Sequence, residues 1–161
     1  VLFRSSLLDE MLSAANLAPS WKNSQTPRFY VATGEKSKDA VREALPEFNR
    51  KNSENASAYI VTTVVLNRSG FDKDGTAVTE IGNGWGYYDL GLNNMALLLK
   101  ATELGISTLV MGIRDGEKLR KEFDIPKTEA VVSVIAVGYT DSEIVRPKRK
   151  SVEDFAKFYE D

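Results

Sequence analysis

The sequence predicts a single domain of the α/β or α+β class, built around a central sheet. Short segments rich in β-branched residues alternate along the chain with segments whose apolar residues recur at helical spacing. The length of 161 residues fits one domain. Neither an internal repeat nor a low-complexity segment interrupts the pattern. We therefore expect a sheet that is covered by helices.

The first half of the chain alternates helix and strand. Apolar residues at helical spacing indicate amphipathic helices. Continuous β-branched runs indicate strands that are buried on both faces. The predicted helices are residues 6–17 and 37–48, with a break at Pro46, and the predicted strands are residues 28–33 and 58–66.

The second half contains the longest helical signal, residues 87–104. This segment is apolar on nearly all sides, which predicts a buried helix, and Gly105 follows it as a stop. The polar stretch before it, residues 67–85, predicts a long loop that a partner or ligand orders. The remaining predicted strands are residues 107–113 and 130–138, and the remaining predicted helices are residues 117–123 and 151–159.

The composition excludes several kinds of site. The chain has no cysteine and no histidine, which removes disulfides, thiolate nucleophiles, Cys/His zinc sites and Ser-His-Asp triads. An enzyme of this composition would rely on a cofactor for its chemistry. The lack of cysteine also fits a cytoplasmic protein.

The charge balance disfavours a nucleic-acid partner, and the lengths of the apolar runs disfavour a membrane span. The net charge is −2, whereas a general nucleic-acid binder is basic. No segment reaches the ~18 consecutive apolar residues of a membrane span. Basic residues gather only at residues 146–150, a footprint without interleaved aromatic residues.

The first five residues, VLFRS, have an unusual origin in our interpretation. The end of a common short-read sequencing adaptor encodes this string. We therefore expect residues 1–5 to be translated adaptor and the natural N-terminus to be missing. The alternative is a genuine short apolar start.

Three stretches together resemble the nitroreductase family of flavin enzymes: AANLAPSWKNSQTPRFYVAT (14–33), YYDLGLNNMALLLKATELGISTLVMG (87–112) and IAVGYTDSEIVRPKRKSVEDF (135–155). The resemblance implies one α+β domain over residues 1–161, a three-layer sandwich around a mixed, mainly antiparallel sheet. It also implies a homodimer with FMN at the subunit interface. NAD(P)H would reduce the flavin, and a small-molecule electron acceptor would reoxidise it in a ping-pong cycle.

The same resemblance implies a flavin-contacting turn before the first strand. The Asn that follows the APS turn, here Asn23, would reach the ring, since an amide both donates and accepts hydrogen bonds. Pro19 and Ser20 would shape the turn, and Gln25 would support it or make a second contact. The alternative is a solvated helix-to-strand loop.

Two further segments complete the implied cofactor site. The backbone of Val110, Met111 and Gly112 would pass near the flavin N5 edge, where glycine permits close approach. Basic residues before the last helix would bind the phosphate through charge-assisted hydrogen bonds. These are Lys148, Arg149 and Lys150. The alternatives are a strand end that needs a small residue and a solvated basic loop.

The chain departs from the family pattern at its start. The family normally carries an Arg-Arg-Ser-x-Arg segment upstream of the APS turn, and its side chains hold the phosphate and ribityl chain. Only Arg4 and Ser5 lie nearby, and we assign them no role. Two lost charge-assisted hydrogen bonds would weaken FMN binding by roughly two to four decades.

Aromatic residues before the long helix are expected to line the acceptor pocket. Trp85 and Tyr88 could stack on flat acceptors, although a core or interface role is equally open. The loop of residues 67–84 would be a variable lid that sets acceptor choice. Two other functions remain open: a flavin-binding protein without turnover, and a same-fold enzyme such as a reductive dehalogenase.

Overall fold

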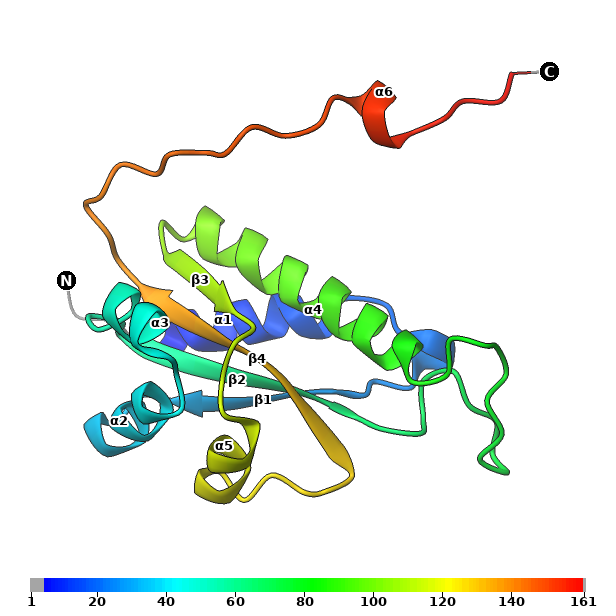
Figure 1. Cartoon of the computed structure of the whole chain (residues 1–161), viewed down its shortest axis with the longest axis horizontal. Coiled ribbons are helices and arrows are strands. Elements are labelled where there is room, and N and C mark those ends of the chain that lie inside the picture. The colour runs from blue at the N-terminus through cyan, green and yellow to red at the C-terminus, as the bar shows by residue number, and fades with distance from the viewer. Residues whose placement is uncertain (1–4, 161) are drawn as a thin grey trace.

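Four antiparallel strands form the centre of the molecule in the computed structural model, which describes residues 5–160 (Figure 1). Their spatial order is β1-β2-β4-β3. The strands are β1 (Pro27–Ala32), β2 (Ala58–Val65), β3 (Ser107–Met111) and β4 (Glu129–Gly138). Every pair is antiparallel, so no parallel member of the expected mixed sheet lies within residues 5–160.

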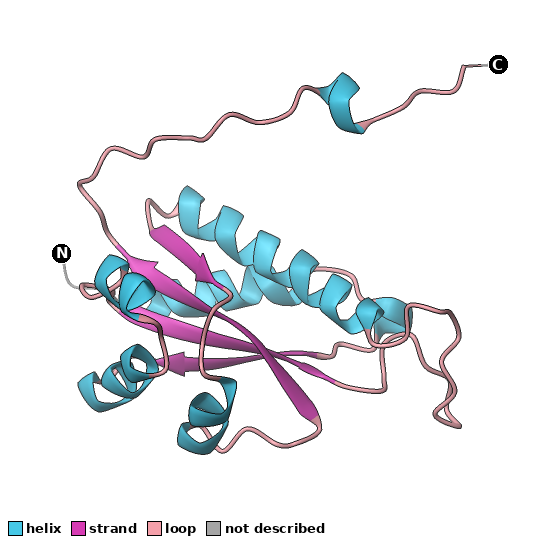
Figure 2. Cartoon of the chain, viewed as in Figure 1, coloured by secondary structure: helices cyan, strands magenta, loops and turns pink. Residues whose placement is uncertain are grey.

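Helices cover both faces of the sheet and give three layers (Figure 2). One face packs against α1 (Ser5–Asn16) and α4 (Gly84–Glu103). The other face packs against α2 (Glu35–Glu43) and α5 (Gly116–Glu122). The expected α+β sandwich is therefore confirmed.

Strand β2 is buried on both faces because its side chains alternate between two apolar clusters. Tyr59 and Val61 belong to the cluster under α2 and α5, whereas Ala58 and Ile60 belong to the cluster under α1 and α4. All four side chains have no exposed surface. A run of apolar and β-branched residues without regular polar alternation fits a strand that is covered on both faces.

The helix break predicted at Pro46 is confirmed. Helix α2 stops at Glu43, and α3 (Glu47–Asn52) starts directly after the proline. Proline lacks the N–H that a continuous helix needs, but it is well tolerated at the start of a new helix.

Helix α4, which was expected to be buried, is covered on one face only within a single chain. Its inner face carries Leu90, Leu97 and Ala101 into the core. On its outer face, Met95 and Leu99 are 51% and 59% exposed. A single chain offers the helix packing partners on one side only, so the second apolar face is left uncovered.

The terminal helix is much shorter than predicted. Only α6 (Val152–Phe155) forms where residues 151–159 were expected to be helical. It belongs to the C-terminal arm, residues 139–160, which extends away from the body in Figure 1. An isolated helix shorter than ~12–15 residues is marginal in water without a surface to pack on.

The adaptor hypothesis falls mainly on residues 1–4, which lie outside the described part of the chain. Ser5 begins α1. Across residues 5–160, none of the helices combines the length and apolar character that crossing a bilayer requires.

The hydroxyl of Tyr30 generates a prediction about alkaline stability. It donates a 2.9 Å hydrogen bond to the buried carboxylate of Glu129. Burial, followed by this hydrogen bond, raises the pKa of Tyr30 from 10.0 to about 12. The folded state therefore holds the phenol proton more tightly than the unfolded chain, and this stabilisation is complete below pH 10 and is lost as the pH rises towards 12.

We expect Tyr30→Phe to lower the free energy of unfolding near neutral pH and to lose this effect as the pH approaches 12. Urea unfolding of both proteins at stepwise higher pH measures the difference. A difference that stays constant across this range would contradict the prediction.

Candidate functional site

The turn between α1 and β1 is tightly folded and strained. Its centre is the 3₁₀ turn η1 (Trp21–Asn23). Lys22, Asn23 and Gln25 have φ angles of 45°, 54° and 49°, in the left-handed region. The hydroxyl oxygen of Ser20 accepts the backbone N–H of Gln25 at 3.0 Å and closes the turn. Left-handed backbone costs a non-glycine residue about 1–2 kcal/mol, and such strain gathers at functional sites.

A cavity of about 320 Å³ lies beside this turn. Two predicted cofactor residues, Ser20 and Gln25, line it. Asn23 and Pro19 are exposed on the same turn. The other lining residues are Leu12, Asn16, Ala18, Pro27, Arg28, Phe29 and Asn93. The structure thus brings together the first group of predicted residues.

The second predicted group lies at the opposite edge of the sheet. Met111 pairs with Val134, Val134 with Val61, and Val61 with Tyr30 on β1. Three strand spacings, roughly 14 Å, therefore separate the end of β3 from β1. The side chain of Met111 is buried in the core, so only its backbone remains for a ligand. Within one chain, Val110 to Gly112 and the strained turn do not meet.

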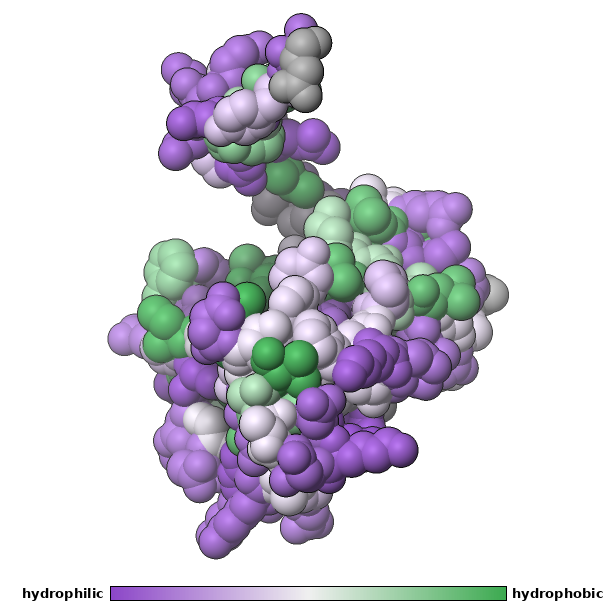
Figure 3. Space-filling model, turned by 90° about the vertical axis from the view of Figure 1, so that its right-hand side faces the viewer, coloured by the Kyte–Doolittle hydropathy of each residue, from purple (hydrophilic) through white to green (hydrophobic). Residues whose placement is uncertain are grey.

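The third predicted group lies on the C-terminal arm. Lys148, Arg149 and Lys150 are exposed, and Arg149 donates a 3.1 Å hydrogen bond to the carbonyl of Pro147 on the arm itself. Figure 3 shows the arm standing apart from the body. One chain therefore does not bring these cations to either of the other groups.

The predicted acceptor residues form an aromatic cluster with the turn. The rings of Trp85 and Trp21 lie 4.8 Å apart, and those of Trp85 and Tyr88 lie 5.8 Å apart. The indole N–H of Trp85 donates to the hydroxyl of Thr79 at 2.8 Å. Tyr88 is 61% exposed and free to meet a flat ligand. Trp85 mainly joins the turn to the loop before α4.

The 67–83 loop is ordered by its own contacts, contrary to the expectation that a partner or ligand orders it. Asn67 and Asn83 pair at its base through two hydrogen bonds. The backbone also approaches itself closely: a Cβ on Gly70 would lie 2.5 Å from the carbonyl oxygen of Gly82. Near the tip, a Cβ on Gly75 would meet nothing within 4 Å. The base is tightly packed and the tip is open.

Helix α4 holds a buried polar group, Asp89, that the sequence indicated only as a helix cap or a member of an internal pair. Asp89 is 2% exposed, and its carboxylate accepts the backbone N–H of Trp21 and the hydroxyl of Ser69. An acid within the strongly apolar part of the helix was the signal available. It could not reveal which distant groups donate to the carboxylate.

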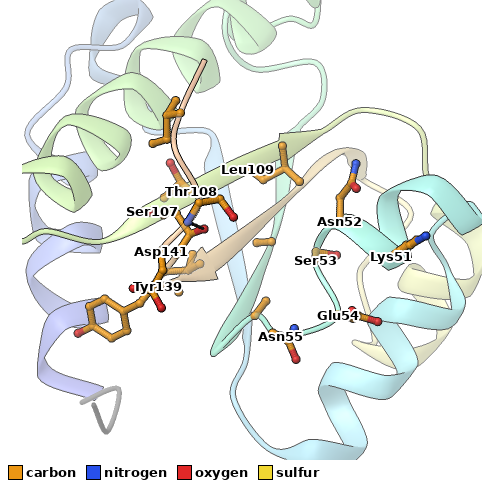
Figure 4. A pocket seen from close by; sticks show the side chains of 17 residues that line it. Lys51, Asn52, Ser53, Glu54, Asn55, Ser107, Thr108, Leu109, Tyr139 and Asp141 are labelled. Atoms are coloured by element: carbon orange, nitrogen blue, oxygen red, sulfur yellow. Dashed lines mark hydrogen bonds between the residues drawn. The ribbon is translucent and has the colours of Figure 1, made fainter. Parts of the chain in front are cut away.

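A larger cavity lies elsewhere. It measures about 610 Å³ and is lined by β3, by the segment after α3 and by the base of the arm (Figure 4). None of the predicted site residues lines it, and its charged side chains are the exposed Lys51, Glu54 and Asp141. We therefore favour the smaller cavity beside the strained turn. Within residues 5–160, no cluster of carboxylate side chains is suited to hold a metal ion.

Comparisons with known proteins agree on one family. The model of the nitroreductase family matches residues 5–139, which include the strained turn and Val110 to Gly112 but not the basic residues of the arm. No curated protein matches the sequence.

Solved structures of this fold superpose on nearly the whole chain at low sequence identity. A nitroreductase family protein from Streptococcus pneumoniae has a TM-score of 0.82 at 20% identity, covering 99% of this chain and 92% of its own. CLA-ER, an enone reductase in a gut-bacterial fatty acid saturation metabolism, has a TM-score of 0.84 at 20% identity, covering 98% and 89%. An oxidoreductase containing FMN has a TM-score of 0.75 at 24% identity, covering 88% and 70%.

Two substitutions at Asn23 test the strain of the turn. We expect Asn23→Ala to lower the free energy of unfolding by about 1 kcal/mol, because alanine tolerates the left-handed region poorly. Asn23→Gly should change it by only a few tenths of a kcal/mol, since glycine adopts this backbone readily. Urea unfolding compares them, and equal losses for both variants would argue against a strained turn.

Proposed function

Because this chain belongs to the nitroreductase family, we propose that it is an FMN-dependent oxidoreductase. It takes a hydride from NADH or NADPH and passes the electrons to a nitroaromatic compound, a quinone or a similar acceptor in a ping-pong cycle. The observation that carries the proposal is the strained turn, which presents the exposed amides of Asn23 and Gln25 beside a cavity. The solved relative that contains FMN supports the choice of cofactor.

The available groups fit FMN chemically. The amides of Asn23 and Gln25 can donate and accept, as the polar edge of a flavin ring requires. A Cβ on Gly112 would meet nothing within 4 Å, so a ring can approach its backbone. The cations from Lys148 to Lys150 suit a phosphate. When bound, FMN would supply the hydride-accepting ring, which a chain without cysteine or histidine lacks.

The side chains and backbone of the protein would bind the flavin ring, orient it and restrict access to it. Asn23 and Gln25 would fix the ring edge, and a backbone N–H at Gly112 would favour the reduced form electrostatically. Tyr88 would stack on a flat acceptor. The 67–83 loop, ordered before any ligand arrives, would limit which acceptors enter.

We also propose that two copies of the chain form the site. The strained turn and Gly112 lie at opposite edges of one sheet, and the basic arm leaves the body altogether. A second copy that supplies one of these groups would unite them on a single ligand.

Uncovered apolar surface supports the dimer. Tyr88, Met95 and Leu99 follow one another at helical spacing on the outer face of α4 and are all more than half exposed. The arm also carries exposed apolar side chains, which are Ile144, Val145, Val152, Phe155, Phe158 and Tyr159. Contiguous apolar surface of this kind marks interaction sites.

Titration with FMN tests the cofactor. We expect the purified protein in excess FMN to show a bound flavin spectrum, and Asn23→Gly to weaken binding by about tenfold through loss of the amide contacts. Anaerobic addition of NADH or NADPH should then bleach the flavin band.

The outcomes separate the candidate functions. Absence of any bound flavin would overturn the proposal. Binding without bleaching would indicate a flavin carrier. Acceptors added to the reduced protein distinguish a nitroaromatic or quinone reductase from a dehalogenase of the same fold.

Light scattering at micromolar concentration tests the dimer. We expect a mass of twice 17.9 kDa for the unmodified chain. Carboxylates placed on the outer face of α4 by Met95→Glu and Leu99→Glu should give the mass of one chain, because burying them unpaired is costly. Phe48→Glu, at an exposed position on α3, is the control that should keep the dimer. A double variant that stays dimeric would rule out this face.

A further inference from the structure

The carboxylate of Asp89 is buried and takes part in none of the ion pairs within residues 5–160. Its two oxygens lie 3.2 and 3.1 Å from the backbone nitrogen of Trp21, which donates to them. One of them also accepts the hydroxyl of Ser69 at 2.5 Å. A buried charge needs such partners, because water no longer solvates it.

The hydroxyl groups form a chain with a fixed direction. Ser69 gives its one proton to Asp89, so it can only accept from its other neighbours. These neighbours are the hydroxyls of Ser24 at 2.5 Å and Thr26 at 3.3 Å. The turn therefore donates through Ser69 to the carboxylate as well as directly through Trp21.

The network joins three parts of the chain that are far apart in sequence. Asp89 lies 68 residues from Trp21 and 20 residues from Ser69. Trp21 and Ser24 belong to the strained turn, Ser69 belongs to the base of the 67–83 loop, and Asp89 belongs to α4. The tilted contact between the rings of Trp21 and Trp85 also joins the turn to α4.

We propose that Asp89 is a positioning residue that holds the strained turn and the base of the 67–83 loop in one fixed relation. This inference rests on the proposed function, in which the turn contacts the flavin and the loop borders the acceptor. Both segments are hydrogen-bonded to one carboxylate. The position of the flavin ring relative to the 67–83 loop would therefore be fixed by Asp89. Loss of the carboxylate would displace the turn even though Asp89, at 2% exposed, offers a ligand almost no surface of its own.

The test compares two variants of this network with a matched structural control. Asp89→Asn removes the charge, and Ser69→Ala removes the hydroxyl link. The control is Glu129→Gln, which also neutralises a buried carboxylate that accepts two hydroxyls, those of Tyr30 and Thr63. Glu129 lies on the side of the sheet away from α4. All three variants should lose thermal stability.

FMN affinity and the visible circular dichroism of the bound flavin are then measured in excess FMN. We expect Asp89→Asn and Ser69→Ala to raise the Kd for FMN about tenfold or more and to change the dichroism. Asp89→Asn removes the charge that strengthens the bonds from Trp21 and Ser69, and Ser69→Ala removes the hydroxyl that links Ser24 to the carboxylate. Glu129→Gln should change neither. For a quinone acceptor, the KM should rise more than kcat falls in Ser69→Ala.

The outcomes are distinct. If the unmodified chain binds FMN while both network variants keep its affinity and dichroism at lower thermal stability, Asp89 is merely structural and the inference is overturned. If Asp89→Asn does not fold, the test rests on Ser69→Ala alone. Unchanged FMN affinity and dichroism in that variant would then overturn the inference. A chain that binds no FMN in any variant overturns the proposed function itself.

Discussion

Burial of the two inner strands on both faces is the constraint on which the rest of the structure depends. The two inner strands, β2 and β4, consist almost entirely of apolar and β-branched residues. Such strands are stable only when helices cover them on both sides. This requirement explains the two helical layers. Helices α1 and α4 cover one face of the sheet, and α2 and α5 cover the other. The outer strands and the segments at their ends are left to carry the functional groups.

The width of the sheet explains why one chain holds the groups of the site apart. A four-stranded sheet places the strained turn before β1 and the end of β3 at its two edges. No change in a loop can close that separation without breaking strand pairs in the core. In the proposed dimer, a second copy would unite the two edges without breaking any strand pair. The separation of the groups and the uncovered face of α4 would thus have one common explanation in the proposed dimer.

The sequence predicted what depends on local patterns and missed what depends on distant partners. Pro46 and the apolar run of β2 act within a few residues, so their effects on helix and strand were foreseen. The outer face of α4 and the terminal helix depend on whether another surface covers them. Asp89 was visible as an acid in an apolar helix, but its donors lie 20 and 68 residues away. Asn23 was found through family resemblance, whereas its strained backbone emerged only from the structure.

The contrast between the base and the tip of the 67–83 loop has a consequence for how this protein can diversify. At the base, Gly70 leaves no room for a side chain beside Gly82 and Trp85. At the tip, Gly75 borders open space, and residues 72–78 are exposed. Insertions and exchanges are therefore tolerated at the tip while the anchored base stays unchanged. Under the proposed function, acceptor specificity would change there in small steps while the scaffold beneath it stays intact.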